Sequence, residues 1–216
     1  MMASLPTPYY SHAGITIYHG DCRGILPHVT ADVVVTDPPY GIFEHGGKWG
    51  RKADLQWDRK PADGVAGIVG DRPAVVWGGN YFGLPPSRGW LVWYKRDAVP
   101  SASQVELAWT SSDANSALFD WPIAATNAER IGHPTQKPLA LMRWCIGFVP
   151  AGTMLDPFMG SGTTLVAAKQ LGRKAIGIEI EEKYCAIAVQ RLQQEVLPLE
   201  PVAPEPAQAD LLGDAS

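Results

Sequence analysis

The sequence predicts an α/β protein with a doubly wound, mostly parallel sheet, and three observations predict it. Short β-branched runs such as Val33-Val34-Val35 are typical of strands covered on both faces. Segments with helical spacing lie between several of these runs. The alternation of strands and helices favours a parallel sheet with helices on both faces. With 216 residues and 46% hydrophobic content, one core and one domain are expected.

In chain order, the first half supplies most of the expected strands. They fall at residues 15–18, 32–35, 74–77, 90–94 and 104–110, which are short apolar runs bounded by Gly, Pro or polar residues. Residues 22–28 are expected to form a short helix. Glu106 lies near the middle of the fifth strand. Residues 41–64 are rich in glycine and charge, so we expect a long, mobile loop there.

The second half alternates helices with strands. Residues 115–130 have no convincing period, and no element is predicted there. Helices are expected at residues 137–148, 163–171 and 181–196, with strands at 153–156 and 175–180; Pro138 is tolerated in the first turn of a helix. We expect one domain over residues 1–197, followed by a disordered acidic and proline-rich tail over residues 198–216.

The composition excludes some classes of protein. Although the net charge is −4, five of the 22 acidic residues lie at or after Glu195, where no Lys or Arg occurs. The rest of the chain is therefore about neutral, and its charge does not exclude a nucleic-acid partner. The three cysteines are scattered, which favours reduced thiols, a cytoplasmic location and no metal site. No apolar run is long enough to span a membrane.

The stretch Thr36-Asp37-Pro38-Pro39-Tyr40 follows directly on the buried run at residues 33–35. The two prolines end backbone hydrogen bonding and stiffen the turn. They therefore present Asp37 and Tyr40 rigidly at the carboxyl edge of the sheet, where open α/β folds bind ligands.

A second stretch, Asp156-Pro157-Phe158-Met159-Gly160-Ser161-Gly162-Thr163-Thr164, passes from a strand through a glycine turn into a helix. The glycines allow a ligand close to the backbone, and the helix start offers N–H groups to a carboxylate or phosphate. The next strand ends in Glu179, where an acid commonly accepts hydrogen bonds from ribose hydroxyls. The pair of features predicts a nucleoside ligand that carries an anionic group.

Together these motifs resemble those of the amino-methylating DNA methyltransferases, which act on adenine N6 or cytosine N4. Asp37-Pro38-Pro39-Tyr40 resembles the family's catalytic motif, and residues 156–162 resemble its S-adenosylmethionine motif. The stretch from His133 to Pro138 is similar to a further cofactor-side motif. The catalytic motif comes first, which is the family's beta order. The resemblance covers residues 15–192 and implies the family's Rossmann-like, seven-stranded sheet.

The resemblance also implies a role for each candidate residue. Asp37, Pro38, Pro39 and Tyr40 would be catalytic, with an extruded base held by Asp37 and the Pro38 carbonyl at its edge and by Tyr40 at its face. No metal is implied, because the methyl donor is already activated. The implied S-adenosylmethionine site comprises Asp21, Cys22, Asp37, Thr135, Lys137, Asp156, Pro157, Phe158, Gly160, Ser161, Gly162, Thr163 and Glu179.

Double-stranded DNA is the expected partner, with a homodimer as an open alternative to a monomer. The family's recognition region is short here, at about residues 112–132, so specificity is either modest or lies in the loop at residues 41–64. The loop supplies the expected DNA-binding residues, which are basic or aromatic: Lys48, Trp49, Arg51, Lys52, Trp57 and Arg59.

Adenine N6 is the favoured target, because cytosine enzymes more often have Ser in place of Asp37. Cytosine N4 remains the first alternative. An RNA or protein-glutamine methyltransferase is a second, although those enzymes usually place the cofactor motif first. A catalytically inactive nucleic-acid-binding module is a third. A bacterial or a phage origin fits a short chain of this type.

Overall fold

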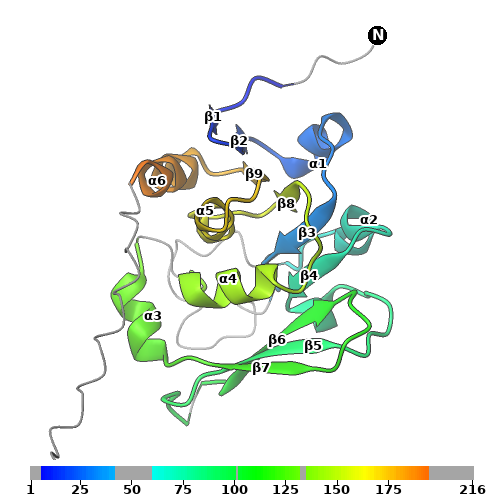
Figure 1. Ribbon diagram of the computed structural model, residues 1–216, viewed down its shortest axis with the longest axis vertical. Coiled ribbons are helices and arrows are strands. Elements are labelled where there is room, and N and C mark those ends of the chain that lie inside the picture. The colour runs from blue at the N-terminus through cyan, green and yellow to red at the C-terminus, as the bar shows by residue number, and fades with distance from the viewer. Residues whose placement is uncertain (1–5, 42–59, 101, 132–134, 195–216) are drawn as a thin grey trace, which may run out of the picture.

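A computed structural model describes residues 6–41, 60–100, 102–131 and 135–194. In these residues nine strands form one sheet, in the order β1-β2-β9-β8-β3-β4-β6-β5-β7 (Figure 1). The strands are β1 (Tyr10–His12), β2 (Ile15–His19), β3 (Val33–Thr36), β4 (Ala74–Trp77), β5 (Trp90–Tyr94), β6 (Val105–Thr110), β7 (Ala117–Asp120), β8 (Met154–Asp156) and β9 (Ala175–Glu179).

The centre of the sheet is parallel, as the apolar runs predicted. Strands β2, β9, β8, β3 and β4 pair in parallel, whereas β6 runs antiparallel to both β4 and β5. All four residues of β3 and all four of β4 are buried, because helices cover both faces of the sheet there.

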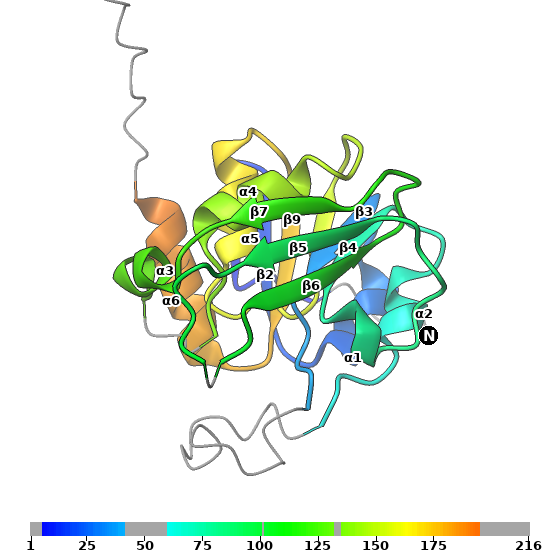
Figure 2. The same ribbon diagram turned by 90° about the horizontal axis from the view of Figure 1, so that it is seen from below.

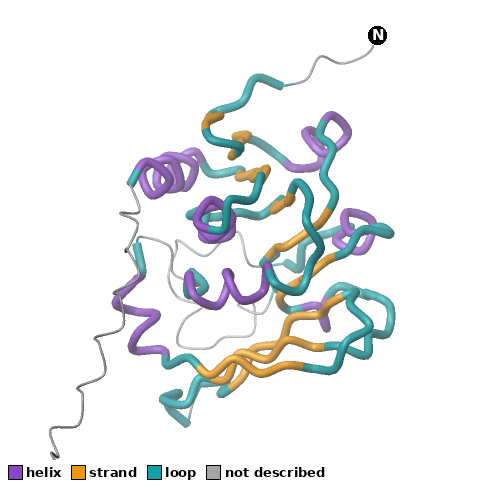
Figure 3. The backbone as a smooth tube through the Cα atoms, in the orientation of Figure 1, coloured by secondary structure: helices purple, strands orange, loops and turns teal. Residues whose placement is uncertain are grey.

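The described part of the chain forms six α-helices, and five of them pack on the two faces of the sheet (Figure 3). On one side α4, α5 and α6 enclose a core with the strands, and on the other α1 and α2 enclose a second core. The helices are α1 (Cys22–Ile25), α2 (Val65–Val69), α3 (Ile123–Glu129), α4 (Leu139–Ile146), α5 (Thr163–Gln170) and α6 (Glu182–Gln193). The predicted doubly wound α/β class is confirmed.

The sheet has more strands than the seven that were expected. The short strand β1 adds to one edge, antiparallel to β2 (Figure 1). Strand β7 adds to the other edge, parallel to β5 (Figure 2). Strand β7 and helix α3 both lie in residues 115–130, where the prediction of no element was wrong. In the predicted helix at residues 22–28, a turn of 3-10 helix over Leu26–His28 follows α1, because Pro27 cannot continue the α-helical hydrogen bonds.

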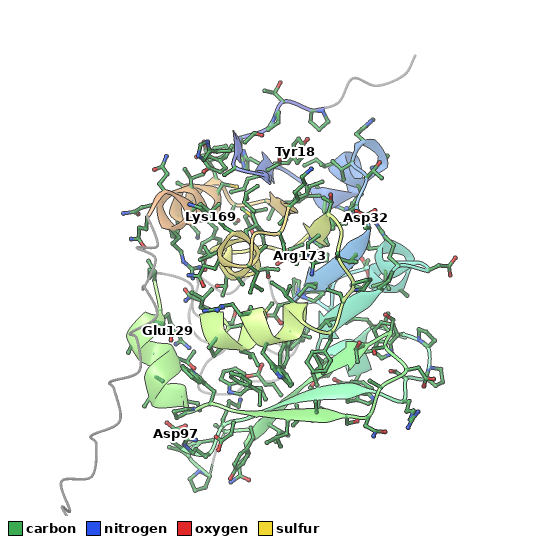
Figure 4. All side chains as sticks on the ribbon, in the orientation of Figure 1. Tyr18, Asp32, Asp97, Glu129, Lys169 and Arg173 are labelled. Carbon is green, nitrogen blue, oxygen red and sulfur yellow. The ribbon has the colours of Figure 1, made fainter. Side chains whose placement is uncertain are left out.

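Helix α3 depends on a cap that is distant in sequence. Its N-cap residue, Pro122, makes no side-chain cap hydrogen bond. Instead, the backbone N–H groups of Ile123 and Ala124 donate to the two carboxylate oxygens of Asp97, at 2.6 and 2.9 Å. Figure 4 labels Asp97 close to this helix. The hydrogen bond from Ala124 is the main cause that lowers the pKa of Asp97.

Two further predictions bear on parts of the chain that the structure does not cover. The boundary at residue 197, the tail at 198–216 and most of the loop at 41–64 lie outside the described residues. Within the described residues, no helix is long and apolar enough to cross a membrane.

Candidate active site

A cavity of about 990 Å³ opens where β3, β8 and β9 end. Its volume lies at the upper end of the range for small-molecule sites, which is roughly 300–1,000 Å³. The structure brings nearly all described candidate residues to this cavity. Those that line it are Asp21, Cys22, Asp37, Pro38, Pro39, Tyr40, Thr135, Lys137, Asp156, Pro157, Phe158, Gly160, Ser161, Thr163 and Glu179.

Gly162 does not line the cavity, but it shapes the turn that leads from β8 into α5. Its φ of +77° is in the left-handed region, where L side chains are strained. A Cβ placed on Gly162 would lie 2.7 Å from the Cβ of Ala188 in α6. The glycine therefore allows α5 to begin directly against α6, which fixes the helix start beside the cavity.

Asp156 links the glycine turn to the catalytic motif. It is buried at the end of β8, and its Oδ1 accepts hydrogen bonds from the Thr36 hydroxyl at 2.8 Å and from the Phe158 backbone N–H at 3.2 Å. Burial raises the pKa of Asp156 to about 6, although these hydrogen bonds favour the carboxylate. Because Thr36 directly precedes Asp37, the two motifs are held in contact across neighbouring strands.

Glu179 supports the glycine turn from the end of β9. Its carboxylate accepts hydrogen bonds from the backbone N–H groups of Gly160 at 2.9 Å and Glu181 at 2.8 Å. Burial raises the pKa of this carboxyl group, and these hydrogen bonds partly counter that effect. Each carboxylate oxygen has a second lone pair, so Glu179 can still accept hydrogen bonds from a ligand.

Arg191 also holds the glycine turn, and no pattern in the sequence indicated this contact. It is buried in α6, and its Nη1 donates to the Ser161 carbonyl at 2.7 Å, the Ser161 hydroxyl at 3.2 Å and the Thr163 hydroxyl at 3.0 Å. An arginine on an amphipathic helix usually faces solvent. Only the packing of α6 against α5 reveals its role.

Both oxygens of the Asp37 carboxylate are held by neighbours. The Tyr40 hydroxyl donates to Oδ1 at 2.5 Å, and the Lys137 ammonium donates to Oδ2 at 2.6 Å. The same ammonium lies 3.3 Å from the Tyr40 hydroxyl. The carboxylate therefore has a fixed plane at the cavity wall. Lys137 was expected to belong to the cofactor site, and the structure adds a direct contact with the Asp37 carboxylate.

Lys137 has a second carboxylate partner, which the sequence reading did not assign to the site. Its Nζ lies 3.2 Å from Oε2 of Glu106 on β6, and Oε1 of Glu106 lies 2.9 Å from Nζ of Lys95. Burial alone would lower the pKa of Lys137, but the carboxylates of Asp37 and Glu106 outweigh burial and raise it. Burial alone would raise the pKa of Glu106, but the ammonium groups of Lys137 and Lys95 outweigh burial and lower it.

The Tyr40 ring has a close aromatic neighbour in Tyr81. The ring centroids are 5.4 Å apart and the rings are inclined by 21°, a stacked arrangement. Tyr81 is 47% exposed and also lines the cavity. The Tyr40 ring also lies so close to Gly78 that a Cβ there would be 2.3 Å from its Cε1.

Asp21 and Cys22 lie at the start of α1, on the cavity wall. Asp21 caps this helix by accepting from the Arg23 N–H at 2.9 Å, and it pairs with the Arg23 guanidinium. The hydrogen bond from the Arg23 side chain is the main cause that lowers the pKa of Asp21 to about 2. Burial raises the pKa of the Cys22 thiol.

The remaining candidates cannot be placed. Lys48, Trp49, Arg51, Lys52, Trp57 and Arg59 lie outside the described residues, as does His133. Of the basic residues at the end of the loop, Lys60 is described, and it lines the cavity. Among the described residues, no group of three or more His, Cys, Asp or Glu could hold a metal ion.

Comparisons with known proteins point to the DNA methyltransferases. A family model described as DNA methylase matches residues 84–190. The type II methyltransferase M.ScaI of Streptomyces caespitosus is 28% identical, over 89% of this chain and 86% of the relative. The crystal structure of M1.HpyAVI in complex with SAM is similar, with a TM-score of 0.59 and 28% identity over 83% of this chain and 100% of the other.

The PvuII DNA methyltransferase shows the same fold at 17% identity, with a TM-score of 0.60 over 88% of this chain and 90% of the other. Fold and site together define a methyltransferase of the α/β, Rossmann-like class. Within that class, the chain is related to the amino-methylating DNA methyltransferases, as its motifs predicted.

Proposed function

We propose that this protein is a site-specific DNA methyltransferase that transfers a methyl group from S-adenosylmethionine to the exocyclic N6 of adenine. The observation that carries the proposal is a single cavity that holds both the Asp37 carboxylate and the glycine turn. The Thr36–Asp156 hydrogen bond joins the two. The likeness to M.ScaI and to a DNA methylase family model supports DNA as the substrate.

The residues around the glycine turn fit S-adenosylmethionine. Gly160 lines the cavity and has no side chain, so a ligand can approach its backbone closely. Glu179 offers carboxylate lone pairs to ribose hydroxyls. Phe158 provides an apolar surface on the same wall. The complex of M1.HpyAVI with SAM supports the same cofactor here. When bound, this cofactor supplies a methyl group that is already activated by its sulfonium.

The chain's own contribution is to make the amine nucleophilic. The lone pair of an exocyclic amine is delocalised into the ring, so an acceptor that attracts an amino hydrogen favours a pyramidal, reactive nitrogen. Asp37 provides that acceptor, because its oxygens keep lone pairs beyond those used by Tyr40 and Lys137. The Pro38 carbonyl is a second acceptor, fixed by the stiff Pro-Pro turn.

A base inside a duplex has to be extruded to reach this cavity, which costs a few kcal/mol. Stacking on an aromatic side chain returns about 1–3 kcal/mol per base. Tyr40 is suited to this role because its hydroxyl is anchored to Asp37, which holds the ring beside the acceptor. Tyr81 now stacks on Tyr40, so a base that takes the same face of Tyr40 has to displace Tyr81.

Cytosine N4 is the alternative target. The fold does not select the base, since the PvuII DNA methyltransferase, which has a similar fold, is cytosine-N4-specific. The leading Asp of the catalytic motif favours adenine. The homodimer, the cytoplasmic location and the DNA contacts of residues 48–59 stay predictions.

Methyl transfer from tritiated S-adenosylmethionine tests the proposal. The purified protein is incubated with double-stranded DNA, with RNA or with a protein extract, and the labelled DNA is hydrolysed to nucleosides for chromatography. Label in N6-methyladenine is the expected result. Label in N4-methylcytosine would select the alternative target, and label confined to RNA or protein would refute a DNA methyltransferase. Asp37→Ala should abolish transfer while calorimetry shows cofactor affinity within about threefold of the wild type.

A further inference from the structure

Four charged side chains form a continuous chain that starts at the proposed catalytic carboxylate. They alternate in sign: Asp37, Lys137, Glu106, Lys95. The successive nitrogen–oxygen distances are 2.6, 3.2 and 2.9 Å. They come from the ends of β3 and β5, from β6 and from the segment before α4, and all four line the cavity.

This arrangement is more than the fold requires. The side chains of Lys137 and Lys95 are only 7% and 9% exposed, and burying charged groups is costly even when they are paired. Apolar residues of similar size often stabilise a core as well or better. In addition, Glu106 lies on the same face of β6 as the buried residues Ala108 and Thr110, where an apolar residue would be the ordinary choice.

The geometry shows what the buried charges achieve. An ammonium group has three N–H donors, and Lys137 has three oxygen partners, on Asp37, Glu106 and Tyr40. A cation–π contact also restrains the ammonium, because Nζ of Lys137 lies 5.4 Å from the centre of the Trp77 ring. The ammonium therefore has one defined position, and Glu106 is the second carboxylate that holds it there.

We propose that Glu106 is a positioning residue for methyl transfer, which acts through Lys137 to fix the plane of the Asp37 carboxylate. Lys95 anchors Glu106 in turn. The inference rests on the proposed function and deepens it, since it assigns a role to two residues outside the motifs. The competing explanation is charge balance alone, in which Glu106 only neutralises two buried lysines and so stabilises the fold.

Variants made in a common background separate the two explanations. Lys95→Met removes the outer lysine and leaves Glu106 on Lys137. Lys95→Met/Glu106→Leu replaces the whole outer ion pair with apolar groups, a change that buried pairs tolerate, and the Asp37–Lys137 pair stays balanced. Lys95→Met/Glu106→Gln returns a neutral acceptor to Lys137. Asp120→Asn, which breaks an exposed ion pair with Arg96, is the control for loss of a carboxylate elsewhere.

The measurements are the single-turnover rate of methyl transfer to DNA, the calorimetric Kd for S-adenosylmethionine and the melting temperature. Positioning predicts that Lys95→Met/Glu106→Leu melts near the wild type and binds the cofactor normally, yet transfers methyl about 10–100-fold more slowly than Lys95→Met. The glutamine variant should recover part of that rate. The Asp120→Asn control should match the wild type.

A transfer rate of Lys95→Met/Glu106→Leu equal to that of Lys95→Met would overturn the positioning role. A rate loss that is matched by an equal loss of folded protein would also overturn the positioning role. A wild-type protein that transfers no methyl group to DNA would overturn the proposed function as well. An active wild type with insensitive Glu106 variants would overturn this inference alone.

Discussion

The substitution Gly78→Ala should disturb the active site through a single methyl group. Gly78 follows β4 and has a φ of +63°, and its Cα faces the Tyr40 ring. An added Cβ would lie 2.3, 2.6 and 2.8 Å from three atoms of that ring. Because carbon atoms ordinarily approach to about 3.5 Å, the Tyr40 ring has to move by roughly 1 Å.

Two magnitudes follow from this geometry. The left-handed backbone should cost an alanine about 1–2 kcal/mol, which lowers the melting temperature of a domain of this size by roughly 2–8 °C. The displaced ring pulls on the Tyr40–Asp37 hydrogen bond of 2.5 Å. A misplacement of about 1 Å in a catalytic arrangement can reduce the rate about 100-fold.

Gly83→Ala provides a matched control. Gly83 has a φ of +62°, but a Cβ there would meet no heavy atom within 4 Å. Both variants should therefore lose the stability that left-handed backbone costs an alanine, and Gly78→Ala should lose more in calorimetry because its Cβ also displaces the Tyr40 ring. Only Gly78→Ala should slow single-turnover methyl transfer. Equal transfer rates in the two variants would refute the link from Gly78 through Tyr40 to Asp37.

Three further predictions concern the cofactor, the pH and DNA. Glu179→Ala should weaken S-adenosylmethionine binding by about 1.5–3 kcal/mol in calorimetry, and an equal loss in the exposed neighbour Glu182→Ala would contradict a specific role. Since the pKa of Asp156 is raised to about 6, the folded state holds this proton more tightly than the unfolded chain. Protonated Asp156 therefore makes its whole contribution to the free energy of unfolding below the pKa of the unfolded chain. About 3 kcal/mol of that contribution is lost as the pH rises from about 4 to about 6. Denaturant titrations of Asp156→Asn should lack this fall, and an unchanged pH profile would argue against it. Arg51→Ala with Lys52→Ala should lower the salt dependence of DNA binding by up to about two phosphate equivalents, without changing cofactor affinity; an unaltered salt slope would exclude the loop as the main phosphate-binding element.

The central strands could be predicted closely because burial on both faces demands an uninterrupted apolar run. The segment expected at 74–77 matches β4 residue for residue. The segment expected at 90–94 matches β5, in which the buried Leu91 and Trp93 alternate with half-buried residues. Strand β7 could not be found in this way, because it is an edge strand whose residues alternate between half-buried and exposed. Its pairing with β5 is a contact between distant parts of the chain. Helix α3 was missed for a related reason, since its cap, Asp97, belongs to another segment.

The same distinction between local patterns and contacts of distant segments applies to the candidate site. Residues at the ends of β3, β8 and β9 were predictable, because local turn chemistry places them at one edge of a parallel sheet. Tyr81, Arg191 and Lys95 act through contacts between elements, which no local pattern encodes. Glu106 did leave a signal, as an acid in the middle of a predicted strand. A charge in such a position indicates a buried partner.

The neighbouring positions of β3 and β8 have a consequence for how such a site can be encoded. Thr36 and Asp156 are hydrogen-bonded although they are 120 positions apart, and each belongs to a strand-and-turn unit that is complete in itself. Helix α6 packs against β2, so the last described helix lies beside one of the first strands. A circular permutation that reads the β8–α6 unit before the β2–β3 unit would keep every one of these contacts. The order of the two motifs along the gene thus depends only on where the termini lie in the fold. Either order of the motifs can build the same site.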